Sequence, residues 1–391
     1  MFAVFASARK AAIACLAVAS ALVLAACDTA TIGGGGPSID TSRPVPVALL
    51  VPRSSAQPGD AVLAQSLENA ARLAVSDLQG VQVDLRVYDT GGNAALAAQA
   101  ASQAVDDGAG IILGPVYAEA ANAAGLAVRS RNVNLLSFSN NASIAGGNVF
   151  ILGPTFANTA TRLANFAAGR GKQSIVIVHS NDVAGQTGRD AFQSALVRTG
   201  SRVSGTVPYD LSQQAVIATV PTIRDTVQSA GADALFLTAN TAGALPLLTQ
   251  LLPEAGVSPD SVQYIGLTRW DIPPQTLELP GVQGGWFALP DPAKAAQFQA
   301  RYQASFGDQP HPIGGLAYDG IAAIGALVGA GNADALTGAA LTQAAGFQGV
   351  GGIFRLLPDG TNQRGLAVAS IQNRQVVVID PAPTNFAGPG L

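Results

Sequence analysis

The sequence GAGIILGPVYAEAANAA, residues 108–124, contains a strand-to-helix transition around which the fold is organised. Residues 111–113 form an apolar run without polar alternation, which is typical of a strand buried on both faces of a parallel sheet. Gly114-Pro115 ends the strand, because proline lacks the N–H of a ladder bond, and the alanine-rich segment from Ala118 favours a helix. Such a turn is either a ligand-contacting loop at a sheet edge or an ordinary connection.

Strands and helices alternate on both sides of this turn. The first block predicts strands at 46–51, 81–89, 111–113 and 132–137, with helices at 61–78, 94–106 and 118–130. The second block predicts helices at 156–168, 187–198, 215–229 and 243–252, with strands at 174–179, 203–209, 234–238 and 263–267. Helices at 293–306, 313–329 and 335–345 follow, and then strands within 352–379. This pattern predicts an α/β fold with two doubly wound parallel-sheet lobes.

The N-terminus has the three parts of an export signal. Arg9-Lys10 precedes an apolar run over 11–26, which ends in the small residues before Cys27. The tetrapeptide Leu24-Ala25-Ala26-Cys27 resembles the lipobox of bacterial lipoproteins. That resemblance implies a signal peptide over 1–26 and a lipid on Cys27; the alternative is a plain signal peptide with a chance cysteine.

Composition limits the classes of function. Residues 27–44 are rich in Gly, Ser and Thr and predict a flexible tether, and no strand or lysine supports phosphate binding by the glycines at 33–36. The net charge of −4 makes nucleic acid an unfavourable partner. With Cys15 in the signal, only Cys27 remains, so no internal disulfide is expected. After the signal, no apolar run of about 18 residues predicts a membrane span.

Six segments resemble, in the same order, the leucine/isoleucine/valine-binding branch of the type I periplasmic ligand-binding proteins. They are NAARLAVSDL (69–78), IILGPVYAEAA (111–121), LLSFSNNAS (135–143), SIVIVHSNDVAGQTGRDAF (174–192), AGADALFLTAN (230–240) and GLAYDGIAAI (315–324). The resemblance implies two lobes that close on a ligand. It implies an N-lobe of 45–153 plus 290–348, a C-lobe of 154–289 plus 349–380, and a tail of 381–391.

The amino-acid clamp of that branch is mostly absent. Ala118-Glu119 replaces the expected Ser, Asn141 aligns with the expected Thr, and Thr268-Arg269 stands near the expected ammonium-binding Glu. A buried ammonium without a carboxylate partner is costly, so an ordinary amino acid binds poorly unless Glu119 or Asp271 takes that role.

The resemblance still places a binding site in the loops after the strands. Its candidate residues are Tyr117, Glu119, Ser137, Ser139, Asn141, Asn240, Arg269, Trp270 and Asp271. Arg269 could hold a carboxylate and Trp270 could stack on a ring. The alternatives are that Glu119 only favours a helix start and that residues 269–271 make a packing contact between the lobes.

Two functions follow from the resemblance. The first is a periplasmic solute-binding lipoprotein that captures a small polar ligand, amino-acid-like or peptide-like, for an inner-membrane ABC permease. The second is an activator of penicillin-binding proteins that contacts a peptidoglycan synthase, because GGWFALPDP (284–292) and LAYDG (316–320) look like that branch. In the lipoproteins that this N-terminus resembles, an Asp directly after the lipidated Cys often keeps the protein at the inner membrane, so Asp28 favours the first function.

Catalytic motifs are absent from the sequence. It has no H-E-x-x-H, G-x-S-x-G or G-x-x-x-x-G-K-[ST], and His179 and His311 stand far apart. We therefore expect no enzyme activity, no cofactor and no metal site.

Overall fold

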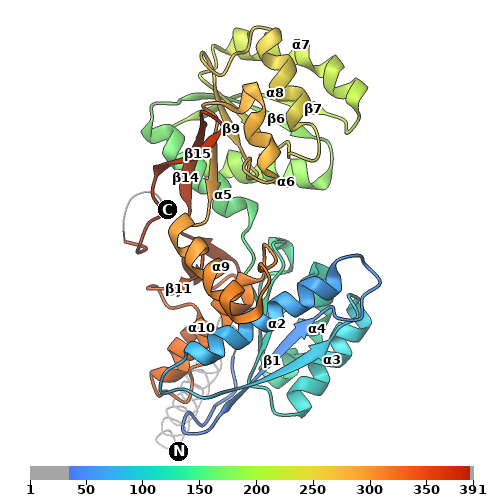
Figure 1. Ribbon diagram of the computed structural model, residues 1–391, viewed down its shortest axis with the longest axis vertical. Coiled ribbons are helices and arrows are strands. Elements are labelled where there is room, and N and C mark those ends of the chain that lie inside the picture. Colours follow the sequence, from blue (N-terminus) through green and yellow to red (C-terminus); the bar gives the residue numbers. More distant parts are fainter. Residues whose placement is uncertain (1–34, 388–391) are drawn as a thin grey trace, which may run out of the picture.

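The computed structural model describes residues 35–387, so the signal segment and Cys27 lie outside the described part of the chain. The described residues form two lobes, one above the other in Figure 1. The predicted α/β fold with two doubly wound lobes is confirmed. Within residues 35–387, no helix is both long and apolar enough to cross a bilayer.

The N-lobe is built on a parallel sheet of order β2-β1-β3-β4-β5. Its elements are β1 (Val45–Val51), α2 (Asp60–Asp77), β2 (Val83–Asp89), α3 (Ala94–Asp106), β3 (Ile111–Leu113), α4 (Ala118–Val128), η1 (Arg129–Arg131), β4 (Asn134–Ser137), η2 (Ala142–Ile144) and β5 (Val149–Ile151). Alternate residues of β1 point to opposite faces: Leu49 packs in the core shared with α2, and Leu50 in the core shared with α3 and α4. Covered faces explain the continuous apolar strands in the sequence.

The C-lobe is built on a seven-stranded sheet of order β15-β14-β10-β9-β8-β6-β7. Its elements are α5 (Phe156–Gly169), β6 (Ser174–Ser180), α6 (Val183–Leu196), β7 (Arg202–Tyr209), α7 (Gln213–Ala230), β8 (Ala234–Leu237), α8 (Leu245–Glu254), β9 (Gln263–Gly266), η3 (Pro274–Glu278), η4 (Pro280–Val282), β10 (Trp286–Leu289), β14 (Ala367–Gln372) and β15 (Gln375–Asp380). Strands β14 and β15 are antiparallel additions beside β10.

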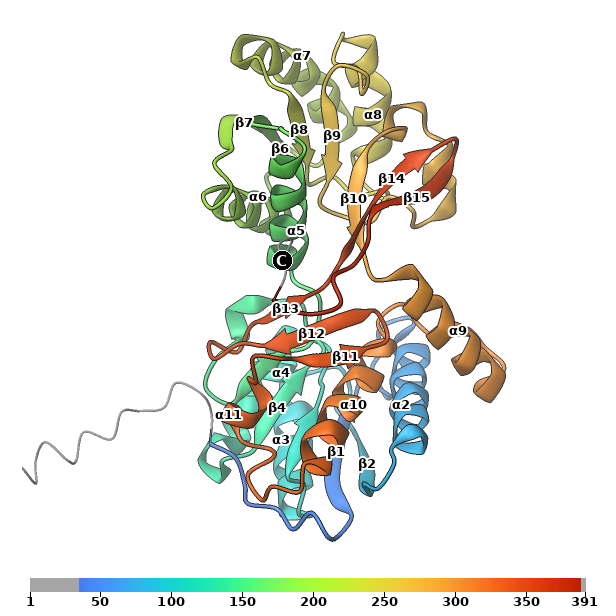
Figure 2. The same ribbon diagram turned by 90° about the vertical axis from the view of Figure 1, so that its left-hand side faces the viewer.

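The chain between β10 and β14 returns to the N-lobe. It forms α9 (Pro292–Phe306), α10 (Gly315–Gly329), the short α11 (Gly338–Leu341), and a small antiparallel sheet of β11 (Phe347–Gly349), β12 (Gly352–Leu356) and β13 (Asn362–Arg364). Figure 2 shows this sheet lying across the N-lobe, below the ascending β14 and β15. Phe354 and Leu356 pack in the same core as α2 and α10.

Two expected boundaries differ from the structure. The resemblance places the return to the C-lobe at residue 349, but β12 and β13 pack on the N-lobe, so the chain crosses after Arg364.

The tether expected over 27–44 is not free from Gly35 onward. Asn134 Nδ2 donates to Gly35 O at 2.7 Å, Ile39 N donates to Ala333 O at 2.9 Å, and Ile39 packs against the N-lobe core. These contacts hold residues 35–39 against the N-lobe, although the segment is rich in glycine and serine.

Candidate functional site

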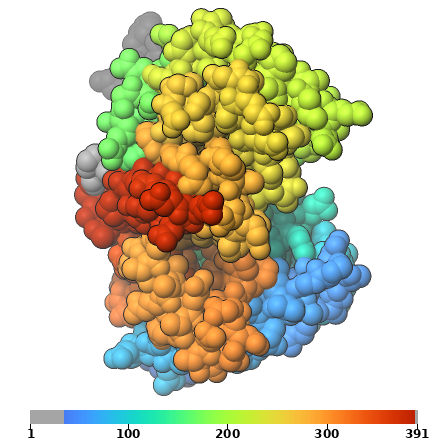
Figure 3. Space-filling view, turned by 45° about the horizontal axis from the view of Figure 1, so that its top comes forward, coloured from blue at the N-terminus to red at the C-terminus, as the bar shows by residue number. Residues whose placement is uncertain are grey.

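The carboxyl edges of both parallel sheets face the space between the lobes. The chain leaves the N-lobe sheet for the C-lobe after the end of β5, and it leaves the C-lobe sheet for the N-lobe after the end of β10. Because the other parallel strands run in the same direction, their following loops lie at the same edges. The space-filling view shows the surface hollowed between the yellow C-lobe and the blue N-lobe segment (Figure 3). Loops at such edges are the usual ligand contacts of open α/β sheets.

The turn after β3 is fixed by close backbone packing. Gly114 has φ +87°, and any Cβ there would clash with the carbonyl oxygen of Leu50. Its N–H donates to Leu136 O at 2.8 Å, which ties the turn to β4. Helix α4 then begins at Ala118, with Tyr117 as the preceding residue and Glu119 in the first turn. The turn therefore presents Tyr117 and Glu119 at the N-lobe edge.

Tyr117 and Glu119 line a cavity of about 400 Å³ at this edge. Its other lining residues are Gln57, Gly92, Asn93, Ala94, Ala118 and Ala120. Tyr117 donates its hydroxyl proton to Asp60 Oδ1 at 2.5 Å. Burial, and then the hydrogen bond to Asp60, raise the pKa of Tyr117 to about 12, so the phenol keeps its proton at neutral pH. Glu119 is exposed and has no hydrogen bond or ion pair within residues 35–387.

Asp60 is a member of this site that the sequence does not single out. It is 5% exposed, and its Oδ2 has no hydrogen-bond partner among the described residues. In the sequence it is only an acidic residue at a helix start, which the helix dipole favours. Only its hydrogen bond with Tyr117, which lies 57 positions later in the chain, places Asp60 next to the cavity.

Ser137, Ser139 and Asn141 form a chain of hydrogen bonds at the end of β4. Ser137 Oγ donates to Pro115 O at 3.1 Å and accepts from Ser139 N at 3.1 Å. Ser139 Oγ accepts from Asn141 N, and Asn141 Oδ1 accepts from Ser143 N. The two serines are buried and shape the loop, whereas Asn141 is exposed. Of these three predicted contacts, Asn141 is therefore the one placed on the surface.

The C-lobe edge carries Asn240, Arg269 and Asp271. Asn240 is exposed and follows β8, and its carbonyl accepts from Gly243 N and Leu245 N. Arg269 Nε donates to Asp271 Oδ1 at 2.9 Å, and a second guanidinium nitrogen bonds Oδ2. This pairing occupies the Asp271 carboxylate, so Asp271 is not placed to take over ammonium binding alone.

The prediction that Trp270 stacks on a ligand is corrected by the structure. Its indole is fully buried in the C-lobe core, and its Nε1 has no partner among the described residues. The ring occupies the space left by Gly266 and Gly285, where any Cβ would clash with it. A side chain held there does not reach a ligand between the lobes.

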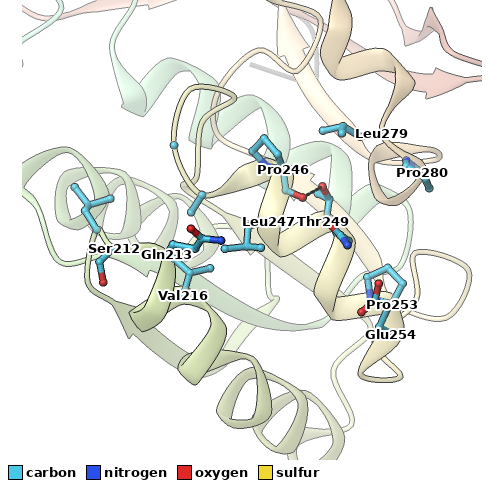
Figure 4. Close-up of a pocket in the computed structure, with 14 residues that line it drawn as sticks. Ser212, Gln213, Val216, Pro246, Leu247, Thr249, Pro253, Glu254, Leu279 and Pro280 are labelled. Atoms are coloured by element: carbon cyan, nitrogen blue, oxygen red, sulfur yellow. Dashed lines mark hydrogen bonds between the residues drawn. The ribbon is translucent and has the colours of Figure 1, made fainter.

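Another cavity, of about 930 Å³, lies within the C-lobe. Figure 4 shows Gln213 and Val216 of α7 facing Pro246 and Leu247 of α8, with Leu279 and Pro280 at one end. The lining is mainly apolar and contains none of the nine predicted site residues.

Within residues 35–387, no group of three or more His, Cys, Asp or Glu side chains is arranged to hold a metal ion.

The fold and the facing sheet edges define a two-lobe binding protein. The family model described as periplasmic binding protein matches residues 44–375, so the chain belongs to that family. No curated protein matches the chain.

Solved structures share the fold at low sequence identity. A protein from Rhodospirillum rubrum, assigned to a branched-chain amino acid ABC transporter, has a TM-score of 0.74 at 20% identity, covering 86% of this chain and all of that one. A Desulfitobacterium hafniense substrate-binding protein in complex with Leu has a TM-score of 0.63 at 16% identity, with coverages of 86% and 100%. A Rhodopseudomonas palustris solute-binding protein in complex with 3,4-dihydroxybenzoic acid has a TM-score of 0.59 at 18% identity, with coverages of 88% and 98%.

Proposed function

We propose that this chain is the solute-binding component of an ABC-type importer. It captures a small polar solute between its lobes without chemical change and presents the solute to an inner-membrane permease. The observation that carries the proposal is the pair of parallel sheets whose carboxyl-edge loops face each other, with the cavity at Tyr117 and Glu119 on one of these edges. The structural relatives named above are described as transporter or solute-binding proteins, which favours this function over the synthase activator.

The contacts proposed for the solute come from both lobes. Tyr117, Glu119 and Asn141 are available on the N-lobe edge, and Asn240 and the Arg269–Asp271 pair on the C-lobe edge. Ser137 and Ser139 act by holding the β4 loop, since their hydroxyls bond the backbone. Closure of the lobes would remove these polar groups from water, so the solute must satisfy them.

Export and anchoring belong to the same proposal. Cleavage before Cys27 and lipidation of its thiol would hold the protein in the periplasm at a membrane, with Asp28 favouring the inner one. Fractionation of the native protein and of Asp28→Ser tests this placement. Native protein in the outer-membrane fraction would favour the activator instead.

The function is tested by native mass spectrometry of the protein purified from its own host, which reads any retained solute. Calorimetry with that solute then compares the parent with Glu119→Ala, Asn141→Ala and Arg269→Ala. Asp308→Ala is the control, because Asp308 is exposed and has no hydrogen bond or ion pair within the described chain. Parent-like binding by all three site variants would reject the proposed site.

A further inference from the structure

The interlobe edges carry more carboxylates than cations. The ends of the parallel strands, the loops after them and the helix starts that follow contain Arg53, Arg269 and Lys294, against Asp60, Asp89, Glu119, Asp182, Asp210, Asp271 and Asp291. Both arginines are paired, Arg53 with Glu68 of α2 and Arg269 with Asp271. The charge of both arginines is thus neutralised and Lys294 donates to Gln348 Oε1, whereas several of the carboxylates, Asp182 and Asp210 among them, have no ion pair in the described chain.

The remaining carboxylates of the C-lobe edge are satisfied by neutral donors. Asp182 accepts from Ser180 Oγ at 2.5 Å and from Gly185 N at 2.9 Å. Asp210 accepts from Asn181 Nδ2 at 2.6 Å. These bonds hold the loops in place but leave the negative charges uncompensated, so the edge attracts cations.

The cavity on the N-lobe edge also carries negative charge without a cation. No cationic side chain lines it, and Glu119 stands at its wall. Beneath it lies Asp60, which is only 5% exposed, with Oδ2 lacking any partner in the described chain. A Cβ at Gly92, which lines the cavity, would lie 3.5 Å from that oxygen, with the Ser55 side chain beside it, so Asp60 lies close behind the cavity wall. A buried carboxylate oxygen without a donor is costly and favours a cation nearby.

Tyr117 completes the recognition geometry. Its hydroxyl proton is committed to Asp60 Oδ1, so the phenol oxygen can only accept a hydrogen bond from a molecule in the cavity. The Glu119 carboxylate is also an acceptor. Within the cavity, the Tyr117 oxygen and the Glu119 carboxylate therefore offer hydrogen-bond acceptors and negative charge together, which suits N–H groups that carry positive charge.

We infer that this N-lobe cavity binds the cationic end of the solute, an ammonium or guanidinium group, through the Tyr117 oxygen and the Glu119 carboxylate above the buried Asp60. The inference rests on the proposed function, and it assigns the class of solute. The positive group lies on the N-lobe, between α3 and α4, on the opposite lobe from the Arg269–Asp271 pair.

The test uses the whole mature protein and a panel of probes in three charge classes. The cations are putrescine, agmatine, lysine and arginine; leucine is a zwitterion with an ammonium group but no charged side chain; glutarate and benzoate are anions without an ammonium group. Ligand binding to the native state raises the melting temperature. We expect a rise with at least one cation and none with the anions.

Calorimetry with the strongest cation then locates its site. Glu119→Gln and Asp60→Asn each remove one negative charge with little change of shape, and we expect affinity to fall by about tenfold or more in each. Asp308→Asn removes the same charge from an exposed position outside the cavity and should bind as the parent does. Glu119→Gln keeps the test decisive if Asp60→Asn does not fold, because Glu119 is exposed.

The outcomes separate this inference from the proposed function. Binding of an anion but of no probe with an ammonium or guanidinium group, or affinity for such a probe unchanged in Glu119→Gln, overturns the inference and leaves solute capture standing. Failure of every probe to stabilise the protein, together with no retained solute, overturns the proposed function as well.

Discussion

The buried position of the Trp270 indole depends on two glycines. Gly266 in β9 and Gly285 before β10 leave the volume that the ring fills. Gly266→Ala forces a Cβ into the ring, and overpacking of this kind costs about 1–3 kcal/mol. We expect that loss in the free energy of unfolding, measured with urea.

The control for this substitution is another glycine-to-alanine change. Gly169 ends α5, and a Cβ added there would meet no atom within 4 Å, so Gly169→Ala should leave stability unchanged or slightly higher. Equal stability of Gly266→Ala and the parent would contradict the packing of Trp270 described above.

Asp182 predicts a pH-dependent contribution at the start of α6. The side-chain hydrogen bond from Ser180, and then the Gly185 N–H, lower the pKa of Asp182 below its ordinary value of 3.8. A lowered native pKa means that the stabilisation is present above pH 3.8 and is lost as the pH falls through the native value. Asp182→Ala should therefore cost about 1 kcal/mol at pH 7, as N-cap losses do, and less below about pH 4.

Asp182→Asn is the matched variant. Asparagine also caps helices, so this variant should keep most of the stability at pH 7 but lose the acid dependence. Thermal melting between pH 3 and 7 measures both effects, and a constant difference between the parent and Asp182→Ala across that range would refute the assignment.

Residue roles were the least predictable part of the site. The turn with Tyr117 and Glu119 was predicted, because a strand, a proline and an alanine-rich helix start are local signals. Burial of Trp270 depends on glycines in other elements, and the Asp60–Tyr117 bond joins residues 57 positions apart. Neither has a signal in a single sequence.

At the scale of elements, buried polar groups join the hairpin of β12 and β13 to residues 151–153, where the chain leaves the N-lobe after β5. Asn362 Nδ2 donates to Ile151 O at 2.8 Å and to Gly153 O at 2.9 Å. Arg364 Nε donates to Leu152 O at 3.1 Å, and its Nη1 pairs with Asp319 of α10 at 3.3 Å. These bonds explain why the hairpin packs on the N-lobe.

Loss of Arg364 should be costly. Its side chain is 10% exposed and that of Asp319 is 2% exposed, so Arg364→Ala leaves a buried carboxylate without its cation. We expect a loss of about 3–5 kcal/mol in urea unfolding. Arg374→Ala, which breaks the exposed pair with Glu278, should cost at most about 1 kcal/mol. Similar losses for the two variants would argue against a buried pair.

The strands of this hairpin were predicted, but their lobe was not. The turn at Pro358-Asp359-Gly360 separates two short strand patterns, which is a local signal. Which lobe they join is decided by Asn362, Arg364 and their partners more than 200 positions earlier in the chain. The helix predicted over 335–345 is also shorter in the structure, where α11 spans only Gly338–Leu341.

At the scale of the molecule, residues 35–43 should contribute to stability. A chain that starts at Pro44 loses the Gly35–Asn134 and Ile39–Ala333 hydrogen bonds and the packing of Ile39. We expect a loss of about 2 kcal/mol relative to a chain that starts at Gly35, seen as a melting temperature lower by several degrees. Equal melting temperatures would mean that this segment contributes nothing.

The docked segment also determines how the molecule is held. Residues 35–39 contact Gly110 and Asn134, which lie at the amino ends of β3 and β4, the sheet edge opposite the loops with Tyr117 and Asn141. If the chain before residue 35 is attached to a surface, the attachment therefore acts on the N-lobe at the sheet edge away from the C-lobe. The length of the strands separates this edge from the proposed solute-binding loops by about 10 Å or more. In the proposed closure on a solute, an N-lobe attached in this way would be the fixed lobe and the C-lobe the one that moves.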